Sequence, residues 1–208
     1  MSKGQYVWYA SYGSNINNER FLCYIKGGKP VGSDKVETGC RDTSLPLNES
    51  LFEIPHPLYF AKESARWGHQ GVAFIGLQTE KENVTLSKKY LITRDQFLDI
   101  LKQENNGLEF DIDLNEVIEE GSMVFRNKAW YGNILYLGES EGYPVFTFTA
   151  PWDITEVKLT KPSIQYLSTI ITGLKNYFTN DEIYRYLKDK PGISTLYSEE
   201  ELLNVINN

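Results

Sequence analysis

Hydrophobic residues recur along the chain with two periods, and each period predicts a different kind of element. Short runs rich in branched and aromatic side chains are typical of strands, whereas apolar residues spaced i, i+3 and i+4 are typical of helices. The runs predict strands at residues 7–10, 57–61, 71–77, 88–93, 129–136 and 143–149. The helical spacing predicts helices after Gly13, from Thr93 to Glu104, from Ile164 to Leu174, from Asp181 to Leu187 and after Ser198.

Polar residues beside these segments indicate where two of the helices begin. Thr93 and Gln96 have the spacing of a capping box, and so do Ser198 and Glu201. Residues 31–56, by contrast, show little periodicity, so we expect a long loop there.

The order of the elements predicts the fold class. Strands dominate the middle of the chain, and helices follow the first strand, precede an acidic stretch and form the C-terminus. We therefore expect a single α+β domain over residues 1–208, with a small, mostly antiparallel, barrel-like sheet and packed helices. In the last strand Val145, Thr147 and Thr149 alternate with two phenylalanines, which predicts one markedly apolar face.

One short segment joins the first strand to the first helix through a glycine. Gly13 can take a positive φ that a side chain would resist, and Ser14 or Asn15 can cap the helix that follows. Unpaired amides at such a helix start favour an anion or a developing oxyanion. The same residues also fit an ordinary strand-to-helix connection.

The predicted helix after Thr93 carries a carboxylate on its apolar side. Phe97 and Ile100 mark the buried face, and Glu104 lies two turns after Phe97. A carboxylate there must reach a polar partner, face a cavity or have a raised pKa, unless it leaves the core at a frayed helix end. Asp99 is expected to point elsewhere.

Several of these segments resemble the γ-glutamylcyclotransferase-like superfamily. Tyr12-Gly13-Ser14-Asn15 after an aromatic strand is similar to the signature loop of that superfamily, and Gln103-Glu104 is similar to the end of its catalytic segment. The resemblance also covers the strand start Gly71-Val72-Ala73, Tyr131, and Pro162-Ser163 followed by Tyr166.

The resemblance implies both a fold and a reaction. It implies the small barrel of that superfamily, and an enzyme without cofactor or metal that cleaves a small-molecule γ-glutamyl amide and releases 5-oxoproline. It implies that Glu104 is the catalytic acid/base. The substrate-binding residues that it implies are Tyr12, Gly13, Ser14, Asn15, Tyr131 and Tyr166.

The sequence departs from the pattern of that family after Glu104. Asn105 occupies a position where the family usually has glycine, and an acidic stretch precedes the next predicted strand. We expect residues 105–128 to be a solvated insertion.

Composition narrows the classes of partner. The 208 residues include 28 acidic and 21 basic side chains, for a net charge of −7, without a long run of Lys and Arg. We therefore expect no nucleic-acid partner. The N-terminus lacks an apolar signal segment, and no window reaches about 18 consecutive apolar residues. These features predict a soluble, cytoplasmic protein without a membrane partner.

Other classes of function use the same residues. An amide hydrolase or deacylase could use the same Glu104 to activate water, and a non-catalytic module could bind a small ligand on this fold. A metal-dependent deacylase is disfavoured because His56 and His69 are the only histidines and form no ligand-spaced cluster. Cys23 and Cys40 lack a CxxC spacing, so we expect buried or idle thiols.

Overall fold

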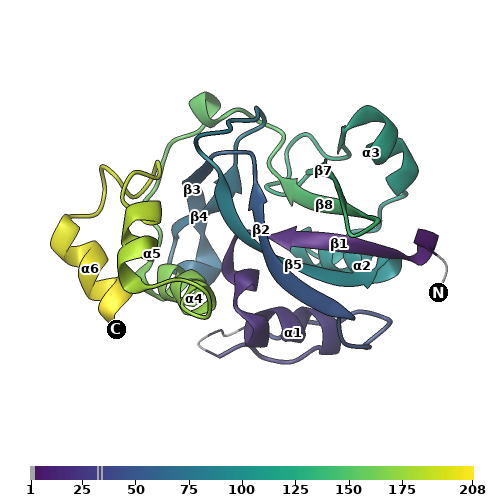
Figure 1. Cartoon of the computed structure of the whole chain (residues 1–208), viewed down its shortest axis with the longest axis horizontal. Helices are drawn as coiled ribbons and strands as arrows, with labels where there is room; N and C mark the ends of the chain where they lie inside the picture. Colours follow the sequence, from purple (N-terminus) through teal and green to yellow (C-terminus); the bar gives the residue numbers. More distant parts are fainter. Residues whose placement is uncertain (1–2, 32, 34) are drawn as a thin grey trace.

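The computed structural model describes residues 3–31, 33 and 35–208, and its strands form one large sheet and one separate hairpin. Six strands pair in the order β2-β5-β1-β8-β7-β6, and β3 pairs with β4 (Figure 1). The strands are β1 (Tyr6–Ser11), β2 (Asn48–Ile54), β3 (Leu58–Ser64), β4 (Gln70–Ile75), β5 (Thr85–Thr93), β6 (Ser122–Val124), β7 (Asn133–Ser140) and β8 (Tyr143–Thr149). β1 and β8 are parallel, and the other neighbouring pairs are antiparallel. The predicted α+β class with a mostly antiparallel sheet is confirmed.

Helices pack against one face of the large sheet, and the β3–β4 hairpin clusters with residues of the other face. Helices α4 to α6 lie with the β3–β4 hairpin at one end of the molecule, and α1 and α2 lie against the large sheet (Figure 1). The helices are α1 (Asn18–Lys26), α2 (Arg94–Glu104), α3 (Leu114–Glu120), α4 (Ile164–Leu174), α5 (Asn180–Leu187) and α6 (Glu199–Asn207). The 3₁₀ turns of the described residues are η1 (Lys3–Gln5), η2 (Ser14–Ile16), η3 (Ala65–Trp67) and η4 (Ile154–Glu156).

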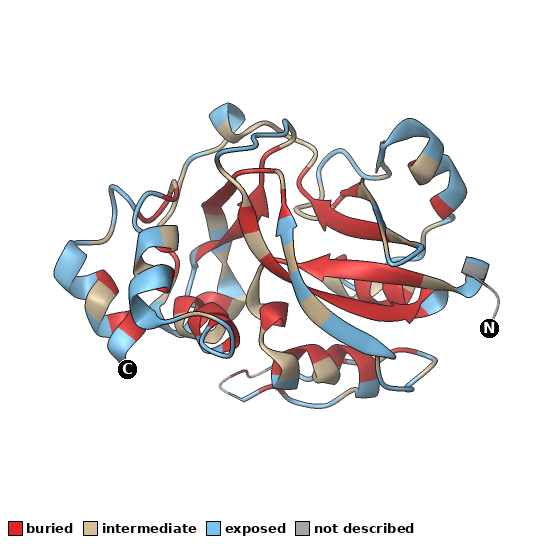
Figure 2. Cartoon of the chain, in the orientation of Figure 1, coloured by how far each residue is buried: buried red, intermediate tan, exposed pale blue. Residues whose placement is uncertain are grey.

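The central strands are buried on both faces, which divides the core in two. In β1, Trp8 packs in a cluster with the β3–β4 hairpin and α4, whereas Tyr9 packs in a second cluster with α1 and α2. In β8, Val145 and Phe146 divide between the same two clusters. The predicted apolar face is present, because Phe146 and Phe148 pack together in the second cluster. The opposite face, with Val145, Thr147 and Thr149, is buried as well, since this strand is covered on both sides. Figure 2 shows the central strands as continuously buried.

The expected barrel-like closure is wrong, because the large sheet stays open between its edge strands β2 and β6. The hairpin meets β8 through a side chain instead of a main-chain ladder. The Thr149 hydroxyl accepts from the Ile75 amide at 3.1 Å and donates to the Ile75 carbonyl at 2.9 Å. One threonine thus satisfies both main-chain groups of a residue that has no strand partner on that side.

The sequence signals for helix starts were reliable, but contacts between residues far apart in the sequence were missed. Both predicted capping boxes are present, at Thr93 and at Ser198. The predicted loop at 31–56 is wrong at its end, where β2 pairs with β5. Asp99 is buried and accepts from the amide and the Nε of Arg41, so it does not simply point to solvent.

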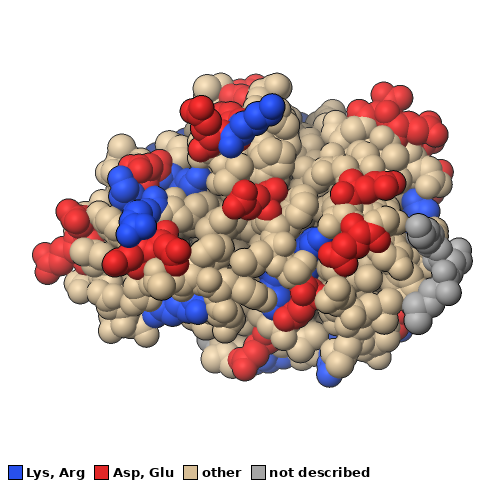
Figure 3. Space-filling view, viewed as in Figure 1, with Lys and Arg blue, Asp and Glu red and all other residues tan. Residues whose placement is uncertain are grey.

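The acidic segment after Glu104 has a structured core and a charged exterior. Helix α3 and strand β6 lie within it, and Leu114 and Val117 are buried against the sheet. Its acidic side chains are exposed, and Figure 3 shows them gathered over α3. Apolar residues therefore anchor this segment, while its charges stay in water.

Candidate active site

The turn after β1 differs in detail from the expected strand-to-helix connection. Gly13 has φ −102° and ψ −146°, so the predicted positive φ is wrong. The turn η2 comes next, and Asn17 caps α1, in place of the predicted Ser14 or Asn15. A close approach favours glycine at position 13, because a Cβ there would lie 3.0 Å from the Tyr166 hydroxyl.

Tyr166 is the residue that brings α4 to this turn. It is buried, and its hydroxyl accepts a hydrogen bond from the Ala73 amide at 3.1 Å. Burial raises the pKa of Tyr166 to about 12, although hydrogen bonds from the Ala73 and Ser14 backbones lower it in part. Tyr12, on the turn itself, donates to the Phe148 carbonyl at 2.9 Å. Both tyrosines are therefore neutral, fixed parts of the wall.

Glu104 is the last residue of α2 and is half-buried. Burial raises the pKa of its carboxyl above the usual value, and the charge of Glu37 raises it further. A hydrogen bond from Tyr24 and the positive charges of Arg66 and Arg20 lower the same pKa. The carboxyl is thus ill-solvated but lies close to positive charge, an arrangement suited to taking up and releasing a proton.

Hydrogen bonds on both sides of Glu104 hold the end of α2 in place. Gln103 accepts from the Gly39 amide at 3.1 Å and donates to the Tyr24 carbonyl at 3.0 Å. The side-chain amide of Asn105 donates to the main-chain carbonyls of Leu101 and Tyr131, at 3.0 and 3.2 Å. The helix end is therefore not frayed, and Asn105 links it to the segment that carries Tyr131.

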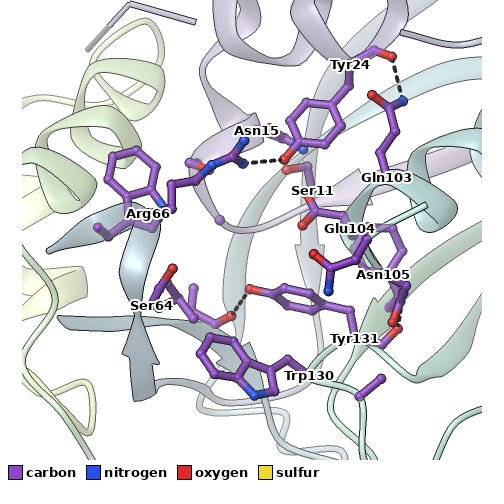
Figure 4. Close-up of a pocket in the computed structure, with 18 of the residues that line it drawn as sticks. Ser11, Asn15, Tyr24, Ser64, Arg66, Gln103, Glu104, Asn105, Trp130 and Tyr131 are labelled. Atoms are coloured by element: carbon purple, nitrogen blue, oxygen red, sulfur yellow. Dashed lines mark hydrogen bonds between the residues drawn. The ribbon is translucent and has the colours of Figure 1, made fainter. Parts of the chain in front are cut away.

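A cavity of about 530 Å³ brings the predicted residues together. Its lining includes all seven residues that the sequence proposed, Tyr12, Gly13, Ser14, Asn15, Glu104, Tyr131 and Tyr166. Tyr131 donates to the Ala73 carbonyl at 3.3 Å. Figure 4 shows Glu104, Asn105 and Tyr131 on one side of the cavity and Arg66 on the other. The structure thus gathers these residues, and their roles remain predictions.

Asn15 lines the cavity and has a buried hydrogen-bond acceptor without a partner in the described part of the chain. Its side chain is buried, and its Oδ1 atom has no hydrogen-bond partner among the described residues. A buried acceptor without a partner is costly. A ligand N–H group would satisfy it.

Sequence reasoning missed the charged side of the cavity. Arg66 donates to the Tyr24 hydroxyl at 3.1 Å and forms an ion pair with Glu37. Arg20 donates to the Ser14 hydroxyl at 2.8 Å, and its guanidinium lies 4.9 Å from the centre of the Trp67 ring. The sequence contained one weak indication of this side of the cavity, because Trp67 lies in a glycine-containing turn just before β4.

Other candidate groups lie outside the cavity lining. His69 is exposed, whereas His56 is buried with its Nδ1 atom 2.8 Å from the Gly76 carbonyl. Cys23 and Cys40 are both free thiols, and Cys40 is buried. Within residues 3–31, 33 and 35–208, no group of three or more His, Cys, Asp or Glu side chains is placed to hold a metal ion, and no helix is long and apolar enough to cross a membrane.

Comparisons with known proteins give one curated relative and several similar structures. No protein-family model matches the chain. Histone deacetylase 5 of Arabidopsis thaliana is 39% identical over 184 residues, which cover 81% of this chain. The chain spans 28% of the length of that relative.

Three solved structures are similar to the chain over nearly its whole length. A gamma-glutamyl cyclotransferase is 16% identical with a TM-score of 0.49, covering 98% of this chain and 99% of that chain. An uncharacterized protein from Homo sapiens is 18% identical with a TM-score of 0.47 and the same coverage. A yeast gamma glutamyl cyclotransferase specific to glutathione is 14% identical with a TM-score of 0.38, covering 98% and 96%.

Proposed function

We propose that the chain is a γ-glutamylcyclotransferase-like enzyme that releases 5-oxoproline from a γ-glutamyl amide. The observation that carries the proposal is that the Tyr12–Asn15 turn and Glu104, far apart in sequence, line one cavity. A proton acceptor and a set of main-chain donors in one enclosed space are what intramolecular acyl transfer requires.

The reaction needs a single proton shuttle. Ionised Glu104 takes a proton from the α-ammonium group of the substrate, and the freed amine attacks the γ-carbonyl carbon. The new C–N bond closes a five-membered ring, and the bond to the leaving nitrogen breaks. Glu104 then passes that proton to the leaving nitrogen, and the second proton that the ring nitrogen loses follows the same route. The products are 5-oxoproline, whose ring amide is neutral, and a free ammonium ion, so neither water nor a cofactor enters the balance. Closure within one molecule benefits from proximity.

We infer a different part of the lining for each end of the γ-glutamyl group. Main-chain amides of the Tyr12–Asn15 turn would hold the α-carboxylate or the oxyanion. The buried, unpartnered Oδ1 atom of Asn15 would accept from a substrate N–H group. Tyr131 and Tyr166, both held by main-chain groups of Ala73, would flank the glutamyl chain.

The test is turnover of a panel of γ-glutamyl amines, with 5-oxoproline and the freed amine both quantified. We expect equal amounts of the two products, and we expect Glu104→Gln to abolish both. The exposed Glu120, outside the cavity lining, gives the matched control Glu120→Gln. Tight binding of these compounds without any turnover would instead identify a non-catalytic binding module.

Two hydrolytic alternatives give different products in the same assay. A hydrolase that uses Glu104 to activate water would release free glutamate in place of 5-oxoproline. The name of the Arabidopsis relative raises deacetylation as a second alternative. Acetyl-lysine peptides therefore belong in the panel, and activity that is lost on chelation and restored by zinc would support that alternative.

A further inference from the structure

Tyr24 joins helix α1 to the end of α2 that carries Glu104. It lines the cavity and is 2% exposed. Its main-chain carbonyl accepts from the Gln103 side chain at 3.0 Å, and its hydroxyl forms a hydrogen bond with Glu104, the next residue of α2. Figure 4 shows the Tyr24 ring between Gln103 and Arg66. Two adjacent residues of α2 are therefore fixed to the same tyrosine, one through its backbone and one through its side chain.

The neighbours of the Tyr24 hydroxyl fix the direction of its hydrogen bonds. Arg66 donates to this oxygen at 3.1 Å, and a guanidinium can only donate. The single hydroxyl proton of Tyr24 is therefore left for Glu104, whose ionised carboxylate can only accept. Arg66, Tyr24 and ionised Glu104 thus form a chain in which each donor faces an acceptor. Because hydrogen bonds to an ionised group are the stronger ones, this chain favours the form of Glu104 that acts as the base.

Arg66 is itself held from behind. Its guanidinium forms an ion pair with Glu37, whose side chain is 1% exposed, whereas the Arg66 side chain is 18% exposed. A buried polar network in which every member has its partner is rigid. The Tyr24 hydroxyl is the group through which this rigidity reaches the Glu104 carboxylate.

The ionisable groups that face Glu104 come from several elements. They are Arg20 and Tyr24 of α1, Glu37 of the loop after α1, Arg66 of η3, Tyr9 of β1, Tyr131 of the segment before β7 and Tyr166 of α4. Burial keeps the four tyrosines neutral by raising the pKa of each. Two guanidinium groups therefore face two carboxylates, while Lys35, 4.0 Å from Glu37, is half exposed.

These charges stabilise the ionised carboxyl group but do not orient it. A Coulomb attraction depends on distance, whereas a hydrogen bond requires an aligned donor and acceptor. Among the groups that face Glu104, Tyr24 is the one whose hydrogen bond to this carboxyl group contributes to its pKa. The direction of the Glu104 carboxylate therefore depends on the Tyr24 hydroxyl.

We propose that Tyr24 is a positioning residue: its hydroxyl, held by Arg66, directs the Glu104 carboxylate toward the substrate nitrogen from which it takes a proton. This assignment rests on the proposed cyclotransferase function. Tyr24 itself forms and breaks no bond in the reaction. A general base acts only within hydrogen-bond reach of its proton, about 2.6–3.2 Å, so a carboxylate that turns freely about its side-chain bonds spends less time in the productive position.

Tyr24→Phe keeps the ring and removes only the hydroxyl. We expect kcat for 5-oxoproline release to fall by about 10- to 100-fold on the high-pH plateau. KM should change little, because the lost contact orients the base and does not bind substrate. The acid limb of the kcat profile should move to higher pH, since a hydrogen bond to the ionised carboxylate is lost.

Tyr197→Phe is the matched control. The Tyr197 hydroxyl donates to the Pro162 carbonyl at 2.8 Å, outside the cavity lining, so this variant should keep the parental kcat, KM and pH profile. A lower melting temperature of Tyr24→Phe with parental kinetics would mean that its hydroxyl serves only the fold, and would overturn the assignment. A higher KM with an unchanged kcat would make Tyr24 a substrate-binding residue and overturn it as well.

A second variant at the same position should give the opposite shift. A tyrosine with one ring fluorine, introduced at position 24 alone, keeps the hydroxyl and makes it a stronger donor, because fluorine withdraws electrons from the ring. The acid limb should then move to lower pH than in the parent. This variant also takes the place of Tyr24→Phe if the latter does not fold. Movement to higher pH, or no movement, would contradict donation from Tyr24 to Glu104.

The hydrogen bond can also be tested in a protein that turns over no γ-glutamyl compound, a result with which the proposed function itself fails. The glutamate carboxyl carbons are isotope-labelled and titrated by NMR, and Glu104→Gln identifies the Glu104 signal by its loss. We expect the Glu104 titration to move to higher pH in Tyr24→Phe and to stay in place in Tyr197→Phe. An unmoved Glu104 titration in Tyr24→Phe would refute the contact and the assignment with it.

Discussion

The cavity has two unlike walls. The first, which we call the motif wall, consists of the Tyr12–Asn15 turn and Glu104. The turn comes just after strand β1, and Glu104 is the last residue of helix α2. The second, the basic wall, consists of Arg20 and Arg66. Glu37 lies behind them, outside the lining, and pairs with both. The motif wall supplies the groups that would touch the reacting atoms, and the basic wall sets the charge around them.

The two walls act in opposite directions on the same carboxyl group. Burial of Glu104 at the end of α2 raises its pKa, whereas Arg66 and Arg20 lower that pKa. A general acid/base works best when neither protonation state is strongly favoured at the working pH. The position of Glu104 and its readiness to exchange a proton therefore come from different parts of the chain.

The largest expected effect is on the motif wall. Glu104→Gln keeps the shape of the side chain but removes the base, so turnover should fall by about 10²- to 10⁴-fold. Thermal stability should not fall, because the variant removes an ill-solvated charge. Initial rates of 5-oxoproline release and a melting curve measure the two. Near-parental turnover would remove Glu104 from the mechanism.

The corresponding change behind the basic wall should affect the fold. Glu37→Gln leaves two largely buried guanidinium groups facing each other without their shared carboxylate. We expect the free energy of unfolding to fall by about 3–5 kcal/mol, measured by urea denaturation. Glu109→Gln removes the partner of Lys102 at the surface. It should change the free energy of unfolding by no more than about 1 kcal/mol. Equal midpoints for the two variants would contradict the buried ion cluster.

A smaller effect is expected where the turn meets α4. Gly13→Val places a side chain 3.0 Å from the Tyr166 hydroxyl, and it should lower kcat/KM by about 10- to 100-fold through misplacement of the turn. The φ of Gly13 is negative, so the cause is crowding and not backbone strain. Adding Tyr166→Phe removes the crowded oxygen and should restore part of the loss. Full activity in Gly13→Val alone would show that the turn does not contact the substrate.

The smallest expected effect is a shift in the pH dependence of kcat/KM, which depends on Glu104 in the motif wall and on Arg66 in the basic wall. Glu104 acts as the base in its ionised form, so kcat/KM should fall as the pH drops through its raised pKa. That fall should occur above the usual value for glutamate, about 4.3. Arg66→Gln removes a charge that lowers this pKa, so the fall should move to higher pH. An unchanged profile would contradict the influence of the basic wall.

Stability has the opposite dependence on the same ionisation. A carboxyl whose pKa is raised by folding stabilises the protein fully below its unfolded pKa, and this contribution is lost as the pH rises through the folded pKa. Glu104 should therefore make the protein less stable as the pH rises through that window. Glu104→Gln should lack this slope in urea midpoints measured across the acidic range. The same slope in both proteins would assign it to another group.

Elements with local signals were predicted well from the sequence. The capping boxes at Thr93 and Ser198, and the helical spacing from Ile164 to Leu174, depend on residues a few positions apart, and all three are present. Strand β2 lacks such a signal, because its side chains alternate between exposed and half-buried at the edge of the sheet. Pairing with β5, and not its own composition, makes it a strand.

The sequence by itself determined the motif wall: β1 leads into the turn, and the spacing from Phe97 places Glu104 on the inner side of α2. Only the tertiary structure decided that the two meet in one cavity, that Tyr166 lies close to position 13, and that Glu37 joins Arg20 and Arg66. Backbone periodicity is local and can be read from neighbouring residues. The pairing of buried charges depends on burial and on segments that come together only when the chain folds.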